Sequence, residues 1–324
     1  MMTKEARQIA VEWVEANWEN YPEFVGARFG GSINVTPDDA PWPDTSDVDI
    51  SILSDAPRSL SQVHYRGVLL EVSTRPMAQF DLSWEAVVSD FRHAIHYSVP
   101  SIIKDPTGRL QAVHERVRVE YPRKKWVTKR CEGATERANA VLDGWLQQIG
   151  FNDDSAWGAV FALYYATFVA AEILALADLR NPTVRKSFVV SRQVLAQCGR
   201  LDLQESLLQA LGAADLTPAQ VDGQLAELRP AFEQASTVIR NPFFFSDMLQ
   251  LDMISSTLGG IQEIIDMGLH REAVFWLQSV RAVAQRAIES DAPDHDKDHF
   301  QQGYSRILDE LGLRTTEQVE IHRG

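Results

Sequence analysis

Residues 24–53 read FVGARFGGSINVTPDDAPWPDTSDVDISIL, and residues 68–73 read VLLEVS. A mostly apolar run ends in the turn Gly30-Gly31-Ser32, and after a long loop Ser46-Asp47-Val48-Asp49 opens a stretch in which apolar and polar residues alternate. Alternation with a period of two predicts a strand over 48–53, and the runs at 24–29 and 68–73 predict two more strands.

Helical patterns surround these strands. Residues Thr3 to Trp18 place apolar side chains on one face of a helix, and the chain after Asp81 again has helical spacing. A helix ends near Tyr121-Pro122, and we find no strand pattern beyond it. We therefore expect an α+β protein with a small-sheet domain over 1–122 and an all-α bundle of roughly five to seven helices over 123–324.

Asp47 and Asp49 are expected to present their carboxylates on the same face of a strand, because side chains at i and i+2 point the same way. Two close carboxylates repel each other unless a cation lies between them. Glu71 adds a third carboxylate in a strand made otherwise of apolar residues and Ser73, where an unpaired charge would be costly. A shared site for Mg²⁺ or Mn²⁺, which prefer oxygen ligands, removes both difficulties.

The glycine turn has a chemistry of its own. Gly30 and Gly31 allow the backbone to approach a phosphate closely, with N–H groups directed at its oxygens, and Ser32 adds a hydroxyl. Turn and carboxylates together predict a site for a metal-bound triphosphate.

Two other interpretations of the same residues fail. In a calcium loop that starts at Asp47, the sixth residue should be Gly and the twelfth Glu, but these positions hold Ile52 and Arg58. A P-loop would need Gly-Lys followed by Ser or Thr, which does not follow the glycines.

The order Gly30-Gly31-Ser32, then Ser46-Asp47-Val48-Asp49, then Glu71 resembles the DNA polymerase β-like nucleotidyltransferase superfamily, and the helical second part resembles aminoglycoside and related antibiotic nucleotidyltransferases. The resemblance implies a mixed sheet flanked by helices, with Gly31 and Ser32 on the β- and γ-phosphates and Asp47 and Asp49 as metal ligands. It also implies that Glu71 completes the metal site or acts as general base. The loop from Ser32 to Asp47 is longer than is usual in the family, and its prolines are expected to make it a stiff flap.

The activity that this resemblance implies is transfer of a nucleoside monophosphate from ATP or another nucleoside triphosphate to a hydroxyl group, with release of pyrophosphate. The expected acceptor is a small molecule, such as an aminoglycoside-like antibiotic, recognised by the helical domain. Two alternatives stay open: modification of a protein or RNA end, and a non-catalytic nucleotide-binding module that retains the fold.

Composition narrows the partners. The net charge of −14 disfavours nucleic acid, which is bound through Lys and Arg contacts to phosphate. Only two cysteines occur in 324 residues and the N-terminus lacks a signal-peptide pattern, so a cytoplasmic protein is expected. We expect it to be a monomer or a homodimer. The apolar stretch Trp157–Leu179 is interrupted by Glu172 and Asp178, which favours a buried central helix over a membrane span.

Three further clusters are assigned no chemistry. The basic residues between Arg123 and Arg130 are expected to form a solvated linker face. The run Asp294-His295-Asp296-Lys297-Asp298-His299 is expected to be a loop or helix start rather than a metal site. His93 and His96, three residues apart on a predicted helix, are expected to pack without a ligand role.

Overall fold

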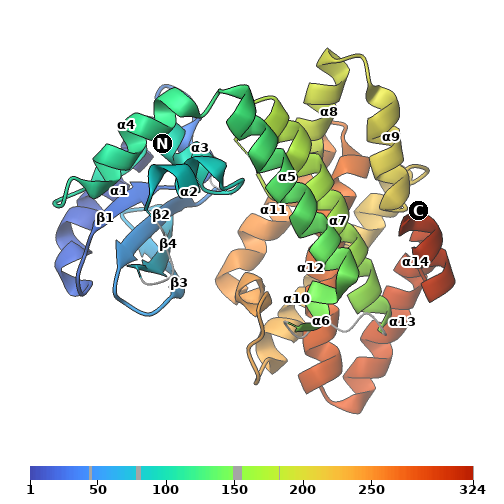
Figure 1. The fold of residues 1–324 in the computed structure, drawn as a ribbon. Helices are drawn as coiled ribbons and strands as arrows, with labels where there is room; N and C mark the ends of the chain where they lie inside the picture. Colours follow the sequence, from blue (N-terminus) through green and yellow to red (C-terminus); the bar gives the residue numbers. More distant parts are fainter. Residues whose placement is uncertain (44–45, 78–81, 149–154, 182, 324) are drawn as a thin grey trace. The chain divides into compact units, whose positions relative to one another are not determined.

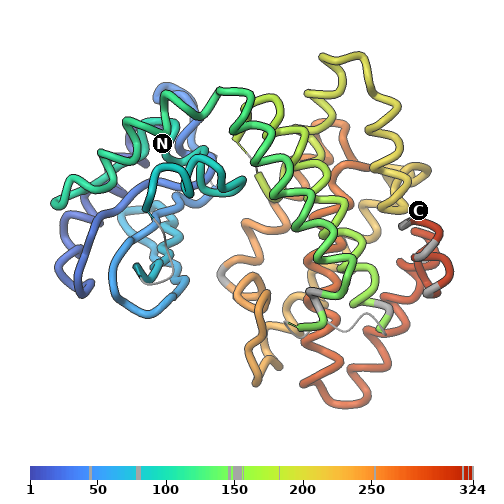
Figure 2. Tube along the Cα trace, in the orientation of Figure 1, coloured from blue at the N-terminus to red at the C-terminus, as the bar shows by residue number. Residues whose placement is uncertain are grey.

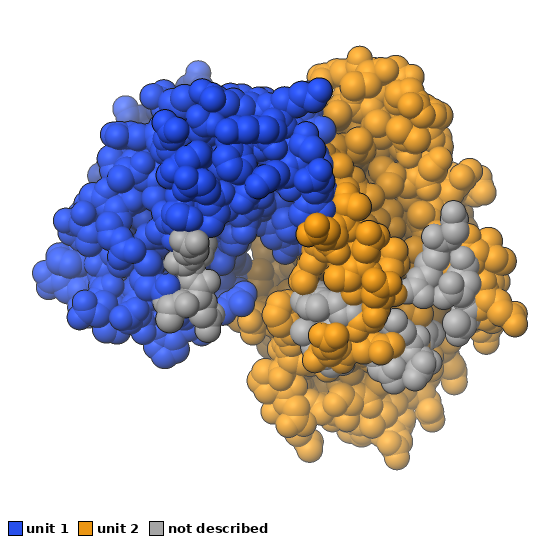
Figure 3. Space-filling model, viewed as in Figure 1, with its two compact units in different colours: residues 1–133, 176–183 blue, residues 134–175, 184–324 orange. Residues whose placement is uncertain are grey.

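The structure is a computed structural model that describes residues 1–324 except 44–45, 78–81, 149–154, 182 and 324 (Figure 1). The chain forms two compact units, which Figure 3 distinguishes by colour. Unit 1 comprises Met1–Gly133 together with Leu176–Thr183, and unit 2 comprises Ala134–Ala175 and Val184–Gly324.

Unit 1 is built on a five-stranded sheet with the strand order β3-β4-β2-β1-β5. Strands β2 and β4 are parallel, whereas the other neighbours are antiparallel, so the sheet is mixed. The strands are β1 (Gly26–Phe29), β2 (Val48–Ser54), β3 (Ser59–Tyr65), β4 (Val68–Pro76) and β5 (Ile102–Lys104). The α+β class expected from the sequence, a small mixed sheet with flanking helices followed by a helical region, is confirmed.

The two faces of the sheet are covered by different helices (Figure 1). Helix α1 (Thr3–Asn17) buries Ala6, Ala10 and Val14 against the apolar side chains of the central strands, such as Ile50 and Val72. On the other face, side chains at the strand ends pack with α2 (Trp84–Ser89), α3 (Ala94–Ser98) and α4 (Arg109–Glu120). The polar residues of β2 and β4 occupy the rest of this second face.

Two strands were not expected from the sequence. Strand β3 is an edge strand whose residues are mostly exposed, so its sequence carries no apolar pattern. It joins β4 through Arg66 and Gly67, which both have positive φ (50° and 83°), as a two-residue hairpin turn requires. Strand β5 has only three residues and lies in a stretch that we expected to be helical.

The described part of the long loop after the glycine turn is bound to the start of α1. The backbone N–H groups of Thr3 and Lys4 donate to the carbonyls of Ala40 and Asp38 at 2.9 and 3.1 Å. Arg7 Nε donates to the carbonyl of Ile33 at 3.1 Å. Hydrogen bonds to the start of α1 therefore hold the part of the loop between Ile33 and Ala40.

The structure divides at residue 133, whereas the sequence suggested residue 122. Helix α5 (Lys124–Ala140) begins in unit 1, where Trp126 joins the core and its Nε1 donates to Glu120 at 3.0 Å. The guanidinium of Arg130 is fully buried and donates to the carbonyls of Val88 and Tyr121 at 2.9 and 2.8 Å. The expectation of a solvated basic face is therefore wrong for Arg130, which fixes the start of α5 to unit 1.

Beyond Lys104, all regular elements among the described residues are helices, and they outnumber the five to seven expected for the bundle (Figure 2). After α5 the regular helix is interrupted at Gly144, where φ is 96°. The run at 294–299 starts a helix, as expected. The helices after α5 are α6 (Leu146–Gln148), α7 (Ala156–Ala177), α8 (Ser187–Gln197), α9 (Leu201–Ala210), α10 (Pro218–Val238), α11 (Ile254–Asp266), α12 (His270–Asp291), α13 (Asp294–Leu311) and α14 (Thr316–Arg323).

Helix α7 contains the apolar stretch noted in the sequence. Within the described residues, Trp157–Ala177 is the one helical segment long and apolar enough to cross a membrane, and 72% of its apolar window is buried inside the structure. The core helix of a globular protein has these same properties, so length and composition alone are weak evidence for a span. The burial agrees with the expected central helix.

The start of α3 depends on the carboxylate of Asp90. Its Oδ1 accepts hydrogen bonds from the backbone N–H groups of Arg92 and His93, both at 2.8 Å, and lies 3.0 Å from His93 Nδ1. Burial raises the pKa of Asp90, but the bonds from the His93 ring and from the two backbone N–H groups outweigh it and lower the pKa to about 2. The folded protein therefore stabilises the ionised form of the Asp90 carboxylate.

We predict that Asp90→Asn destabilises the protein at neutral pH by about 1 kcal/mol, because the full shift would be worth about 2 kcal/mol and solvent screens a side chain that is 42% exposed. The folded pKa is depressed, so this stabilisation is present above the unfolded pKa and is lost as pH falls toward 2. Urea unfolding at pH 7 and pH 3 measures both effects. The exposed Asp39→Asn is the matched control, and an equal loss at both pH values would contradict the prediction.

Candidate functional site

Strand β1 leads directly into the turn Gly30-Gly31-Ser32, which is packed against Asp49. The N–H of Gly30 donates to the carbonyl of Asp49 at 2.8 Å and extends the pairing of β1 with β2. A Cβ on Gly31 would lie 1.8 Å from Asp49 Oδ2, and Gly31 has a φ of 50°. Only glycine allows this backbone to lie so close to the carboxylate.

The carbonyls around the turn are held by polar side chains. Asn34 Nδ2 donates to the carbonyl of Phe29 at 3.2 Å, and Thr36 Oγ1 donates to that of Ser32 at 2.9 Å. The backbone N–H groups of Gly31 and Ser32, by contrast, have no acceptor among the described residues. These two N–H groups are therefore not used by the described part of the fold.

The sheet brings the predicted carboxylates together. Asp49 and Glu71 are direct partners in the parallel β2–β4 register. Asp47 lies just before β2, which begins at Val48, so it is not part of the strand as the sequence suggested, but its charge acts on Asp49. Burial, the charges of Asp47 and Glu71, and a hydrogen bond with Glu71 all raise the pKa of Asp49 well above its usual range. A hydrogen bond between two carboxyl groups needs a proton on one of them, and this proton partly relieves the repulsion.

Arg28 lies beside these carboxylates and was not singled out from the sequence. It is 1% exposed, pairs with Ser51 across β1 and β2, and places its guanidinium 5.1 Å from the centre of the Tyr97 ring. Its positive charge lowers the pKa of Asp49, against the four effects that raise it. A lone arginine in an otherwise apolar strand was the signal that could have identified it.

Of the two histidines of the α3 region, His96 lies close to Asn34 beside the turn. His93 pairs with Asp90, and burial lowers the pKa of His93 despite that pairing. His96 Nδ1 lies 3.4 Å from Asn34 Nδ2, and burial together with the Arg28 charge lowers the pKa of His96 well below its usual range. Neutral His96 therefore supports Asn34, and through it the carbonyl of Phe29 at the entry to the turn.

The residue types in this cluster suit a metal ion, but their arrangement in the structure does not form a metal site. Three carboxylates are hard oxygen donors of the kind that Mg²⁺ and Mn²⁺ prefer, and the raised pKa of Asp49 shows that its charge is incompletely compensated. Across the described ranges, however, no group of three or more His, Cys, Asp or Glu residues is arranged to hold a metal ion.

Asn181 is a second residue that sequence reasoning missed. It belongs to the part of unit 1 that follows α7, and its Nδ2 donates to the carbonyl of Gly31 at 3.1 Å. The two residues are 150 positions apart, so no local pattern could have joined them.

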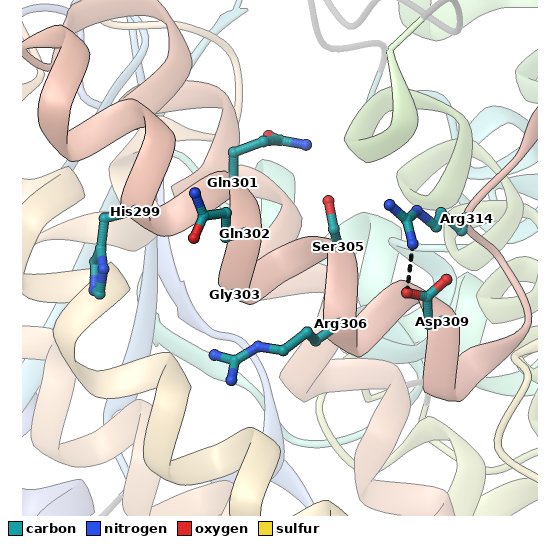
Figure 4. Close-up of a pocket in the computed structure, with 8 residues that line it drawn as sticks. All are labelled: His299, Gln301, Gln302, Gly303, Ser305, Arg306, Asp309 and Arg314. Atoms are coloured by element: carbon teal, nitrogen blue, oxygen red, sulfur yellow. Dashed lines mark hydrogen bonds and ion pairs between the residues drawn. The ribbon is translucent and has the colours of Figure 1, made fainter.

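Unit 2 has pockets of its own, and one lies along α13 with a volume of about 540 Å³ (Figure 4). Its arginines are paired with carboxylates: Arg314 lies 2.7 Å from Asp309, and Arg306 lies 3.4 Å from Glu227. None of the site residues expected from the sequence lines this pocket.

Comparison with known proteins gives little. No protein-family model matches the chain, and no curated protein matches it. Among solved structures, the chain is similar to a nucleotidyltransferase-like protein from Exiguobacterium sibiricum, with 14% sequence identity and a TM-score of 0.29 over 80% of this chain and 91% of that chain. We draw no conclusion from a likeness at this TM-score.

We predict that Asp49→Asn stabilises the metal-free protein at pH 7 by about 1 kcal/mol, because it removes a charge that its surroundings disfavour. The folded pKa of Asp49 is raised, so the native state holds the proton more tightly. The stability that this proton contributes is present below the unfolded pKa and is lost as pH rises through the folded pKa.

Urea unfolding in a metal chelator, from pH 5 to pH 8, compares the wild type with Asp49→Asn and with the exposed control Asp55→Asn. The wild type and the control should lose more stability across this range than Asp49→Asn. A variant that is less stable than the wild type throughout would show that the Asp49 charge is compensated in the fold.

Proposed function

We propose that this protein is a metal-dependent nucleotidyltransferase that transfers a nucleoside monophosphate from ATP or another nucleoside triphosphate to a hydroxyl group of a small molecule. One observation carries the proposal: a turn with unused N–H donors lies against Asp49, and Asp49 interacts with two further carboxylates. Anion donors next to a carboxylate cluster suit a ligand that combines phosphates with a cation.

The residues divide into two groups by chemistry. The N–H groups of Gly31 and Ser32, with the Ser32 hydroxyl, bind the terminal phosphates of the donor. Asp47 and Asp49 would hold Mg²⁺ or Mn²⁺, which when bound supplies charge neutralisation for the triphosphate, and Glu71 would either complete this metal site or act as general base. Arg28 stabilises the buried carboxylates, because its positive charge partly offsets their mutual repulsion.

In the reaction, the acceptor hydroxyl oxygen forms a bond to the α-phosphorus while the bond from that phosphorus to the bridging oxygen breaks. The hydroxyl proton passes to a carboxylate base, for which Glu71 is the candidate, and pyrophosphate leaves with the electron pair of the broken bond. The main contributions of the chain are positioning and electrostatics, as in phosphoryl transfer generally.

The acceptor class rests on charge and on the family that the motifs resemble. A net charge of −14 favours a neutral or cationic acceptor over nucleic acid. An aminoglycoside-like polyamine alcohol combines cationic groups with hydroxyls, and the resemblance assigns recognition of this acceptor to the helical part of the chain.

We predict that the wild type with Mg²⁺ releases pyrophosphate from at least one nucleoside triphosphate when a hydroxyl acceptor is present, and that Asp49→Asn lowers this rate by about 10³-fold or more. Triphosphate with Mg²⁺ should also raise the melting temperature of the wild type, because the ligand binds only the native state, and should not raise that of the variant. The exposed Asp55→Asn should behave as the wild type.

The assay covers the four common nucleoside triphosphates against a panel of aminoglycosides and simpler polyols. Triphosphate-dependent stabilisation without pyrophosphate release from any pair would indicate a non-catalytic nucleotide-binding module. Release that depends on tRNA or on a protein acceptor instead would overturn the small-molecule assignment, and an electrophoretic shift with tRNA tests the first of these directly.

A further inference from the structure

The segment Leu176–Thr183 joins α7 to α8, yet it belongs to unit 1 together with the sheet. This segment comprises the last two residues of α7 and the residues that follow it. Its described contact with the candidate site is made by Asn181, whose amide Nδ2 donates to the carbonyl of Gly31 at 3.1 Å. Asn181, which is 150 residues from Gly31 in the sequence, thus contacts the turn for which the sequence predicted phosphate binding.

The hydrogen bond to the carbonyl of Gly31 also determines the direction in which the N–H of Ser32 points. The carbonyl of Gly31 and the N–H of Ser32 belong to one planar trans peptide, in which the two groups point in opposite directions. A hydrogen bond that fixes the Gly31 carbonyl therefore also fixes the Ser32 N–H, which has no acceptor among the described residues.

Gly31 does not set this orientation by itself. Its φ of 50° lies in a region that glycine enters freely and can also leave freely, because glycine has no Cβ to restrict it. Asp49 lies against one side of the residue, so that a Cβ there would come within 1.8 Å of Oδ2. Asn181 supplies the second restraint, on the carbonyl, and the peptide plane is defined by both.

The environment of Asn181 argues against a purely stabilising role. Its Oδ1 is enclosed and has no hydrogen-bond partner among the described residues. A buried amide oxygen without a partner is destabilising, so this side chain offsets the benefit of its one bond. An apolar side chain would avoid that loss but could not hold the Gly31 carbonyl.

We infer that Asn181 is a positioning residue for donor binding: it holds the Gly31–Ser32 peptide so that the Ser32 N–H faces a phosphate of the triphosphate. This inference rests on the proposed function. Asn181 acts through the turn and does not contact the reacting atoms.

The test compares Asn181→Ala and the isosteric Asn181→Asp, which cannot donate when ionised, with Asn17→Ala. Asn17 is a matched control in the same unit, since its Nδ2 also donates to a backbone carbonyl, that of Trp13, at 2.7 Å. The probe is a non-hydrolysable ATP analogue with Mg²⁺, and calorimetry gives its Kd. We expect Kd to rise about fivefold in Asn181→Ala, the value of one net hydrogen bond, and further in Asn181→Asp, with no change in Asn17→Ala.

A second readout needs no ligand. The amide ¹⁵N resonance of Ser32 responds to hydrogen bonding at the preceding carbonyl, and it should shift in both Asn181 variants but not in Asn17→Ala. In steady-state assays the variants should raise KM for the triphosphate and leave kcat within about twofold, which a general loss of fold would not do. If Asn181→Ala is too unstable to purify, Asn181→Asp, which keeps the shape of the side chain, carries the same comparison.

The outcomes separate this inference from the proposed function. If the wild type binds the analogue and both Asn181 variants bind it equally well, the inference is wrong and the proposed function stands. If the wild type does not bind the analogue at all, the proposed function fails and the inference fails with it. An unchanged Ser32 resonance in both variants would also overturn the inference.

Discussion

The contact between Gly31 and the carboxylate of Asp49 sets the geometry of the candidate site. No side chain fits between them, so the backbone of the turn lies directly on the acidic strand. The pairing of β1 with β2 maintains this contact, because the N–H of Gly30 continues the ladder onto Asp49. N–H donors and acidic groups from different strands are thereby brought side by side, although they favour ligands of opposite charge.

This arrangement is electrostatically strained in the absence of a ligand. Asp49 is opposed by Asp47 and Glu71 and is partly compensated by the buried Arg28. A fold optimised for stability alone would replace such a cluster with apolar residues of similar volume. In the proposed function the same charges would attract a cation, so the electrostatic strain and the proposed chemistry would have one origin.

Much of unit 1 could be predicted from local patterns. The alternation in residues 48–53 predicted β2, whereas Asp47, which was expected on the same strand face as Asp49, lies just before the strand. The register that makes Glu71 the direct partner of Asp49 comes from parallel pairing between strands, which no single segment encodes. Strand β3 was missed because an exposed edge strand needs no apolar face, and β5 because three residues are too few for a period.

The site residues that were missed are those whose partners are distant in the chain. The importance of Arg28 depends on its charge interaction with Asp49 on the neighbouring strand and on its contact with the Tyr97 ring. The importance of Asn181 depends on its hydrogen bond to the carbonyl of Gly31, 150 residues away in the sequence. Side-chain type at one position cannot reveal such partners, whereas the glycine turn and the acidic pair were visible because they are local.

The unit that contains the sheet is discontinuous in sequence, since residues 176–183 complete it after the chain has entered and left the helical unit. A recombinant fragment that stops at Gly133 would contain every strand that the structure describes and all the acidic residues of the cluster, but not Asn181. Restoring the missing amide to such a fragment would require a peptide supplied in trans, as in fragment complementation. A linear cut that separates the two halves of this protein therefore cannot separate its two compact units.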